Sequence, residues 1–340
     1  MGKQVTIVDI ARETGLSVAT VSRVLNHHGS VKEETRARVA EAAARLGYQE
    51  NSLAKGLGAE TGNCIGMLIP DIRTPFYGRI FSECEKIAVK KGYVLSFCNS
   101  FNNVKLEMHF YSHLLAQHAA GVIQIGGSLD RQTIPPQLYS QICATAEKIP
   151  VITSVPVEHS ACRCVYVDNY RSMRTLLEYL IGLGHRRIAF VGGRSNVKST
   201  LEKRQAYTDV LREHAIRDIL ISEGNYGQED GYLAVKKLFR QKVVPTAVIA
   251  VTDMCAIGVM QALNELGLRC GADVSVASFD NTYIAEMFEP ELTSISTDYE
   301  ILSETIINTM IDMIEKKETK DVYELPLIFS ERRSCTRISQ

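Results

Sequence analysis

The stretch IARETGLSVATVSRVLN, residues 10–26, decides how the amino-terminal part of the chain folds. Gly15 can adopt the positive φ of a tight turn, and Ser17 stands where the N-cap of a following helix belongs. A helix-turn-helix is therefore predicted, with its second helix beginning near Val18. The apolar residues that recur at the spacing of two packed helices are Ile10, Ala11, Leu16, Val21, Val24 and Leu25.

The outward face of the second predicted helix is small and polar. With the apolar residues turned inward, it presents Val18, Ala19, Ser22 and Arg23. Small side chains let a helix enter the major groove of DNA, hydroxyls reach phosphate oxygens, and arginine reads guanine bidentately. Helical pairs of this kind also occur in proteins that never meet DNA, so the motif alone leaves both interpretations open.

The residues around this motif form a longer pattern without gaps. TIVDIA at 6–11 and VATVSRVLN at 18–26 are followed by EETR at 33–36 and LGY at 46–48, where a third helix over 33–46 is expected. This pattern resembles the head of the lactose-repressor (LacI/GalR) family of bacterial transcription regulators. The resemblance implies DNA contacts from Thr6, Ser17, Val18, Ala19, Thr20, Ser22, Arg23, Asn26 and Leu57.

Residues 51–62 follow the head as a hinge helix and linker. A two-turn helix is marginal in water, and Gly56 lowers its stability by about 1 kcal/mol relative to alanine. The resemblance implies that this helix pairs with that of a dimer mate and that Leu57 wedges into the minor groove. The alternative is a plain interdomain linker with Leu53 and Leu57 packed on a neighbour. Gly56 and Gly58 depart from the family, whose members usually have better helix formers there.

Composition indicates a globular protein of two or three units. The chain has 340 residues, 45% hydrophobic and 23% charged, with no apolar run near eighteen residues and no apolar signal core at its start. We therefore expect no membrane segment and a cytoplasmic location. The nine scattered cysteines favour reduced, mostly buried thiols, and no metal site is expected.

Charge neither favours nor excludes nucleic acid. The chain carries a net charge of −1, and residues 1–60 hold eight Lys or Arg against seven Asp or Glu, a net +1. Because this field is weak, DNA affinity must depend on where the charges point, assisted by hydroxyls and helix N-termini.

From Cys64 onward, short β-type runs alternate with helical stretches, which predicts parallel α/β sheets. Two successive series indicate two lobes with a cleft at the carboxyl ends of their strands. The first series comprises strands at 65–69, 94–98, 122–125 and 151–152, and the second comprises strands at 164–167, 188–191, 219–222, 247–251 and 274–278; a helix at 299–315 and strands at 323–325 and 328–329 end the chain.

Landmarks along this region resemble the type I periplasmic-binding-protein core of the same family. They include TPF at 74–76, VDN at 167–169, TDM at 252–254 and FDN at 279–281. The predicted fold is a small all-α helix-turn-helix head plus an α/β two-lobed core. Its expected divisions are the head at 1–50, the hinge and linker at 51–62 and the core at 63–340, with a first lobe of 63–160 and 293–320 and a second lobe of 161–292 and 321–340.

Polar and aromatic residues at the predicted strand ends are candidates for binding a small effector. Carboxylates and amides bond to vicinal hydroxyls, and aromatic rings stack on the apolar face of a sugar. The candidates at strand ends are Phe76, Tyr77, Asp168, Asn169, Asp253 and Asp280. The resemblance implies three more: Lys203, Arg204 and Tyr226, of which Tyr226 matches an aromatic that stacks on the ligand in relatives.

Each candidate also has a structural interpretation. Asp168 and Asp280 suit a helix cap or a turn, and Phe76 and Tyr226 suit a core. Asp253, between a buried strand and a helix, is the favoured ligand contact. The resemblance places Lys203, or Arg204 after a shift in register, where the family usually has an effector-binding arginine.

No catalytic constellation is apparent. His109 and His113 have the i, i+4 spacing of a zinc pair but lack the glutamate of HExxH, and GxGxxG and GxxxxGK[ST] are absent. We expect no enzyme and no cofactor. The resemblance implies a homodimeric repressor that binds double-stranded operator DNA and a sugar-like effector. The alternatives are a regulator acting mainly through a protein co-regulator, a solute-binding protein and a sugar enzyme.

Overall fold

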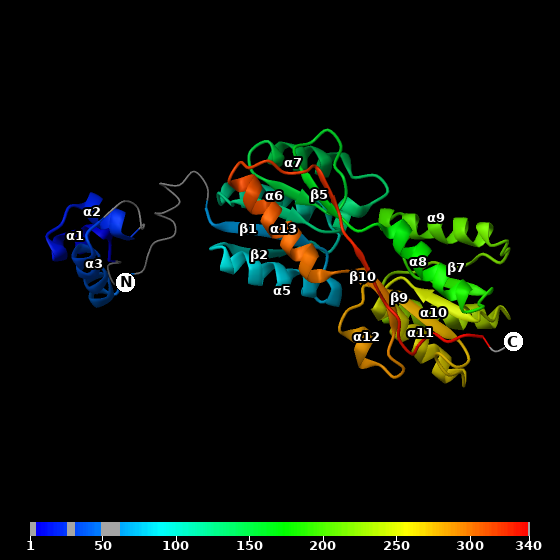
Figure 1. Ribbon diagram of the computed structural model, residues 1–340. Coiled ribbons are helices and arrows are strands. Elements are labelled where there is room, and N and C mark those ends of the chain that lie inside the picture. Colours follow the sequence, from blue (N-terminus) through cyan, green and yellow to red (C-terminus); the bar gives the residue numbers. More distant parts are fainter. Residues whose placement is uncertain (1–4, 26–30, 49–61, 339–340) are drawn as a thin grey trace. The chain divides into compact units, whose positions relative to one another are not determined.

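The computed structural model describes residues 5–25, 31–48 and 62–338, and it divides into two compact units, 1–60 and 61–340 (Figure 1). Asn26, Leu57 and all but the last residue of the predicted hinge segment lie outside the described residues. The predicted combination of a small helical head with two parallel α/β lobes is confirmed.

The first unit contains three helices, as predicted. Thr6 precedes the first helix, and its backbone N and its Oγ1 both donate to Asp9 Oδ2, at 2.9 and 2.7 Å. Gly15 ends that helix with a φ of 67°, in the left-handed region that glycine adopts without strain. The helices are α1 (Ile7–Thr14), α2 (Val18–Leu25) and α3 (Glu33–Leu46), and their shared core consists of Ile10, Ala11, Val21, Val24, Val39 and Ala42.

The first lobe is built on a six-stranded parallel sheet in the order β11-β5-β4-β3-β1-β2. Along β1, Ile65, Met67 and Ile69 face α5 and α13, whereas Leu68 faces α6 and α7, because successive side chains alternate across a sheet. The strands are β1 (Cys64–Ile69), β2 (Val94–Asn99), β3 (Gly121–Gln124), β4 (Val151–Thr153), β5 (Arg163–Tyr166) and β11 (Val322–Glu324); the helices are α5 (Pro75–Lys90), α6 (Val104–Ala116), α7 (Pro136–Ala146) and α13 (Tyr299–Ile314), with a short 3-10 helix η1 (Gly127–Asp130).

The second lobe is built on a six-stranded sheet in the order β12-β10-β9-β8-β6-β7, in which β12 is antiparallel to β10. α8 packs against α9 and α10 packs against α11 (Figure 1). The strands are β6 (Ile188–Val191), β7 (Leu220–Ser222), β8 (Ala247–Ala250), β9 (Ser275–Phe279), β10 (Thr293–Thr297) and β12 (Leu327–Ser330); the helices are α8 (Asn169–Gly182), α9 (Lys198–Glu213), α10 (Gln228–Arg240), α11 (Asp253–Glu265) and α12 (Ile284–Met287).

Strand pairing corrects the predicted lobe boundaries. The sequence predicts a strand at 164–167 in the second lobe, but β5 pairs with β4 and β11 in the first sheet. Conversely, β10 lies in the second sheet, and the chain returns to the first lobe only at α13. The boundaries near 161, 293 and 321 therefore shift toward the carboxyl end by a few residues. Pairing partners are distant in sequence, so alternation alone could not identify them.

None of the described helices is long and apolar enough to cross a membrane.

Candidate functional site

A cavity of about 460 Å³ lies between the lobes, at the carboxyl ends of their strands. Its volume is in the range of small-molecule sites, about 300–1,000 Å³. Both lobes supply polar groups to its wall. Those of the first lobe include Asp71, Asn102, Asp130, Ser154 and Tyr166, and those of the second include Asn169, Arg194, Lys198, Glu202, Lys203, Asn225 and Asp280.

Most of the predicted effector residues line this cavity. They are Phe76, Tyr77, Asn169, Lys203, Tyr226 and Asp280, whereas Asp168, Arg204 and Asp253 are absent from its wall. The aromatic residues come from both lobes, since Phe76 and Tyr77 lie in the first turn of α5 and Tyr226 precedes α10. The cavity can therefore offer ring faces and hydrogen-bonding groups to one ligand.

Lys203 is held by a chain of hydrogen bonds within the second lobe. Its Nζ donates to Asn169 Oδ1 at 2.7 Å, and Asn169 Nδ2 donates to Glu202 Oε2 at 3.0 Å. The Nζ also lies 4.8 Å from the ring centroid of Phe279. Burial lowers the pKa of Lys203, and the nearby carboxylates of Asp280, Asp130 and Glu202 oppose that shift.

Arg204 has a different environment. Its Nη1 pairs with Glu223 Oε1 at 2.5 Å, and its Nη2 donates to the carbonyl of Gly193 at 2.9 Å. Lys203 rather than Arg204 therefore occupies the cavity wall.

Asp280 follows β9 and contributes to the cavity wall. Burial raises the pKa of its carboxyl to about 8, with a further contribution from Asp253 and an opposing one from Lys203. Its φ of 92° is unusual for a residue with a side chain.

Asp168 and Asp253 take structural positions. Asp168 Oδ1 accepts a hydrogen bond from Arg171 N at 2.8 Å and so caps α8. This is the structural role that the sequence analysis gave as the alternative to ligand contact. The Asp253 carboxylate is buried and accepts four hydrogen bonds: from Ser278 Oγ at 2.5 Å, Ser294 Oγ at 2.9 Å, Thr282 N at 2.6 Å and Thr282 Oγ1 at 2.8 Å. These four protein donors favour a structural role for Asp253, and its predicted role as a ligand contact stays a prediction.

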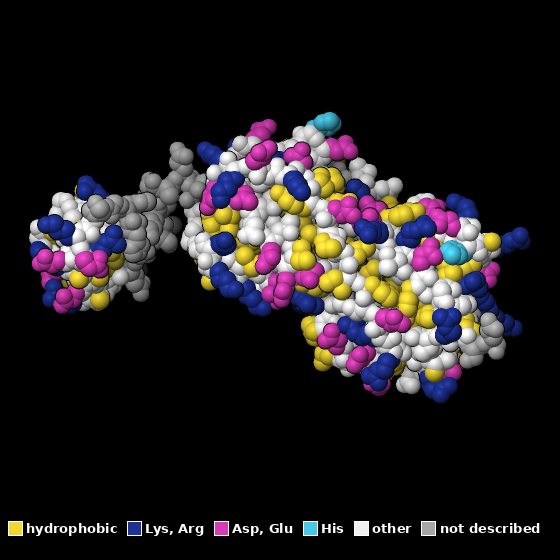
Figure 2. Space-filling model, viewed as in Figure 1, with side chains coloured by type: hydrophobic (Ala, Val, Ile, Leu, Met, Phe, Trp, Pro, Cys, Tyr) yellow, Lys and Arg dark blue, Asp and Glu magenta, His cyan; other side chains and the backbone are white. Residues whose placement is uncertain are grey.

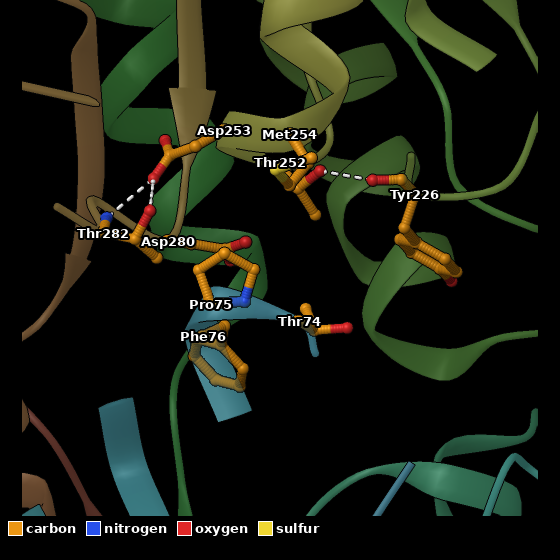
Figure 3. Close-up of a pocket in the computed structure, with 9 residues that line it drawn as sticks. All are labelled: Thr74, Pro75, Phe76, Tyr226, Thr252, Asp253, Met254, Asp280 and Thr282. Atoms are coloured by element: carbon orange, nitrogen blue, oxygen red, sulfur yellow. Dashed lines mark hydrogen bonds between the residues drawn. The ribbon is translucent and has the colours of Figure 1, made fainter. Parts of the chain in front are cut away.

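Figure 3 shows this arrangement in a small pocket where the start of α5 meets the start of α11. Asp253 turns toward Thr282, while Asp280 lies between the two helix starts, near Pro75. Sequence reasoning placed Asp253 at a strand end but could not determine its orientation, because its partners Ser278 and Ser294 are 25 and 41 residues away.

Asp130 is a cavity residue that the sequence analysis missed. Its Oδ1 accepts from Ser199 N at 3.1 Å and its Oδ2 from Ser199 Oγ at 2.6 Å, joining η1 of the first lobe to α9 of the second. Gln132 N also donates to the carbonyl of Asn196 at 2.9 Å. The lobes therefore touch at this side of the cavity, and burial raises the pKa of Asp130.

Two consecutive glycines bring Asp130 to this position. Gly126 and Gly127 have φ values of 68° and 76°. A Cβ on Gly126 would collide with the hydroxyl of Tyr77, and one on Gly127 would lie 2.5 Å from Glu107 Oε1. In the sequence, Gly126 and Gly127 follow a predicted strand and precede Asp130, and this pattern could have identified Asp130 as a cavity residue.

The described DNA-contact candidates of the head lie at the cap of α1 and along α2 with its cap. Ser17 Oγ accepts from Thr20 N at 3.1 Å and lies 2.8 Å from Thr20 Oγ1, which confirms Ser17 as the cap. Thr6, Ala19 and Arg23 are exposed, as is Val18 at 40%, while Thr20 and Ser22 are half-buried. Figure 2 shows Lys or Arg side chains of the head interspersed with Asp or Glu.

The described residues offer little for metal binding or thiol chemistry. The rings of His109 and His113 stack with centroids 6.0 Å apart, but no group of three potential ligands is found in the described ranges. All nine cysteines are unpaired thiols, and burial raises the pKa of Cys84 and Cys255 to about 12.

A helix-turn-helix head joined to a two-lobed core is the architecture of a DNA-binding regulator of transcription. The chain belongs to the LacI family of bacterial regulatory proteins. The family description "Bacterial regulatory proteins, lacI family" matches residues 6–51, and "Periplasmic binding protein-like domain" matches residues 177–335.

Relatives along most of the chain are regulators of transcription rather than enzymes. Catabolite control protein A of Priestia megaterium is 34% identical over 295 residues, which cover 86% of this chain and 87% of that protein. The HTH-type transcriptional repressor PurR of Serratia proteamaculans (strain 568) is 31% identical over 337 residues, which cover 97% and 96%.

Solved structures agree with the fold. The lac repressor dimer bound to operator and the anti-inducer ONPF matches with a TM-score of 0.88 and 26% identity, covering 98% of this chain and 100% of that chain. The transcriptional regulator CelR in complex with cellobiose matches with a TM-score of 0.70 and 24% identity, covering 97% and 100%. This protein is therefore a DNA-binding regulator of the LacI family.

Proposed function

We propose that this protein is a homodimeric repressor whose affinity for a near-palindromic operator is controlled by a small polyhydroxyl effector, a sugar or a sugar derivative. The observation that carries the proposal is the cavity of about 460 Å³ with polar groups from both lobes. A ligand that bonds to both walls stabilises the closed arrangement over an open one and so shifts the equilibrium between them.

The chemistry of the cavity suits a sugar. Asn169, Asn225 and Asp280 offer amide and carboxyl groups to vicinal hydroxyls, and Phe76 and Tyr226 offer ring faces to the apolar side of a pyranose. Lys203 offers one charged donor, which lacks the bidentate geometry of an arginine. The cellobiose complex of CelR is a precedent for a sugar in this fold.

The head supports DNA binding through its exposed residues. Val18, Ala19 and Arg23 lie on the outer surface of α2, which we propose as the helix that enters the major groove. Thr6, Ser17, Thr20 and Ser22 would reach phosphates through their hydroxyls. Asn26 as a further contact and Leu57 as the minor-groove wedge remain proposals on residues outside those described.

Exposed apolar side chains of the core support a second copy of this chain as partner. β2 is an edge strand, and on it Val94 is 55% and Phe97 51% exposed. In the second lobe, Tyr283 and Met287 are 58% and 73% exposed at α12, where Figure 2 shows hydrophobic side chains at the surface. Open apolar edges promote association, and a matching surface on a second copy would cover them.

The DNA-binding part of the proposal is tested by gel-shift titration of the full chain on the region upstream of its own gene. Specific binding should exceed binding to random duplex by at least about 10³-fold at physiological salt. Equal affinity for both duplexes at every salt concentration would refute the function.

The effector is found by thermal-shift screening against a panel of sugars and sugar phosphates, because a ligand that binds the folded state raises its apparent stability. The shift given by a true effector should disappear in Asp280→Asn and Lys203→Ala. A compound that still raises the melting temperature of both variants binds outside this cavity.

A further inference from the structure

Two side chains of the first lobe bind two consecutive backbone carbonyls of the second lobe. Tyr299 Oη donates to the carbonyl of Asp280 at 2.6 Å, and Arg79 Nη1 donates to the carbonyl of Asn281 at 3.2 Å. The guanidinium carbon of Arg79 also lies 4.1 Å from the ring centroid of Tyr299. The two donors are thus held together and bind the same turn.

The donors belong to the first lobe. Arg79 is on α5, and Tyr299 is the first residue of α13. Tyr299 is only 3% exposed and packs in the core that α5 and α13 form with the first sheet. Its ring is also 6.0 Å from that of Phe76, which lines the cavity.

The turn belongs to the second lobe. Asp280 N donates to the carbonyl of Ile295, and Asn281 N donates to Ser294 Oγ at 3.1 Å. The Asn281 side chain is fixed at both ends, because its Nδ2 donates to Ser330 Oγ at 3.0 Å and its Oδ1 accepts from Arg332 Nη1 at 2.9 Å. A movement of the second lobe therefore carries the turn with it.

The backbone of this turn is in a sparsely populated conformation. Asp280 and Asn281 have φ values of 92° and 45°, and both carry side chains. Such residues keep their conformation only when their surroundings hold them in place. The hydrogen bonds from Tyr299 and Arg79 are part of those surroundings, and they come from the opposite lobe.

We propose that Arg79 and Tyr299 are positioning residues that form an interlobe latch, holding the Asp280–Asn281 turn so that the Asp280 carboxyl faces the cavity. The same residue then bears the ligand contact through its side chain and the lobe contact through its carbonyl. An effector that bonds to Asp280 displaces the turn and loosens or tightens the latch, which changes the angle between the lobes. This role rests on the proposed function of the cavity, but the latch can be tested without a ligand.

The test is amide hydrogen exchange, followed by mass spectrometry, on the full chain without ligand or DNA. Tyr299→Phe keeps the ring and removes the hydroxyl, and Arg79→Ala removes the guanidinium. Each should raise exchange in peptides covering residues 279–283 about fivefold, as expected for the loss of one hydrogen bond. Arg79→Lys keeps the charge over the ring and should give a smaller increase.

Lys86→Ala is the matched control, because Lys86 lies on the same helix and pairs only locally, at 2.8 Å from Glu83 Oε1. It should leave residues 279–283 unchanged. If Arg79→Ala raises exchange within α5 alone, or if Tyr299→Phe has no effect on the turn, the latch is refuted.

A second measurement separates positioning from general support. Burial and Asp253 raise the pKa of the Asp280 carboxyl, and Lys203 lowers it. Tyr299 binds the carbonyl of Asp280, and Arg79 binds that of Asn281. Tyr299→Phe and Arg79→Ala should each shift the pH at which thermal stability falls. Neither should cause this shift in a chain that also carries Asp280→Asn, because the carboxyl that titrates is then missing. An equal shift in both backgrounds contradicts the proposal. If no effector binds to the cavity, the proposed function is refuted. Both tests of the latch remain valid in that case, because neither uses a ligand.

Discussion

The Asp130 carboxylate of the first lobe and Ser199 of the second lobe are joined by two hydrogen bonds, to the backbone N at 3.1 Å and to the Oγ at 2.6 Å. Ser199 is the second residue of α9, where the helix N-terminus also favours a negative charge. This pair lies beside the cavity and closes one side of it. Lobe closure therefore depends in part on the contact between Asp130 and Ser199, and a substitution of either residue can remove that contact.

Ser199→Ala removes one of these hydrogen bonds and should lower the free energy of unfolding of the core by about 1–2 kcal/mol. It should also weaken binding of any effector, because closure becomes less favourable. Urea unfolding and ligand titration measure the two effects. Ser140→Ala on α7 is the control, since its hydroxyl bonds only to the carbonyl of Pro136 on the same helix. Equal effects of the two substitutions would contradict the closing role.

The pH dependence of stability should carry the signature of Asp280. Burial raises the pKa of its carboxyl in the folded protein to about 8, from 3.8. The folded state therefore binds more protons than the unfolded state between these values, and stability falls as pH rises through that interval. The pKa values of Asp130 and Asp253 are raised by burial and act in the same direction.

Thermal unfolding between pH 4 and pH 9 tests this expectation. Asp280→Asn should reduce the slope without abolishing it, because Asp130 and Asp253 remain. A profile identical to that of the unmodified chain would mean that Asp280 is already ionised throughout this range.

Asp253→Ala should destabilise the core more than Asp168→Ala. The first leaves Ser278, Ser294 and Thr282 without their buried acceptor, which we expect to lower the free energy of unfolding by about 2–4 kcal/mol. The second removes an exposed helix cap, worth about 1 kcal/mol. Urea denaturation measures both. If Asp253→Ala left stability intact and abolished effector binding, Asp253 would be a ligand contact after all.

Gly258 allows α11 to lie close against α10. A Cβ at this position would collide with the carbonyl oxygen of Gln228, so Gly258→Ala should destabilise the second lobe by about 1–3 kcal/mol. Gly182→Ala is the control, because nothing lies within 4 Å of its added Cβ at the end of α8. Its stability should be unchanged or higher by up to about 1 kcal/mol. Differential scanning calorimetry distinguishes the two.

Arg23→Ala should lower discrimination between operator and random DNA by about 1–3 kcal/mol, as expected for the loss of one base contact. The side chain is exposed, so the fold of the head should not change. Arg45→Ala removes an equal charge from α3, where Arg45 pairs with Glu13 at 2.5 Å. That control should weaken binding to both duplexes alike. Equal losses of discrimination would exclude Arg23 from base contact.

The sequence by itself determined the elements that depend on neighbours in the chain. The head follows from a helical period, a glycine at the turn and the Ser17 cap, all within a few residues of one another. Most strands and helices of the core were predicted for the same reason. Strand ends then placed Phe76, Asn169 and Asp280 in the cleft, because parallel strands bring their carboxyl ends to one edge.

Only the tertiary structure decided the strand pairings and side-chain contacts that join residues far apart in the sequence. β5 belongs to the first lobe because its hydrogen bonds go to β4 and β11, and β11 lies more than 150 residues further along the chain. Asp253 became a buried acceptor because hydroxyls from β9 and β10 fold onto it. Contacts such as those of Asp130 with Ser199 and of Arg79 with Asn281 join separate lobes, so their energies depend on packing that no local pattern encodes.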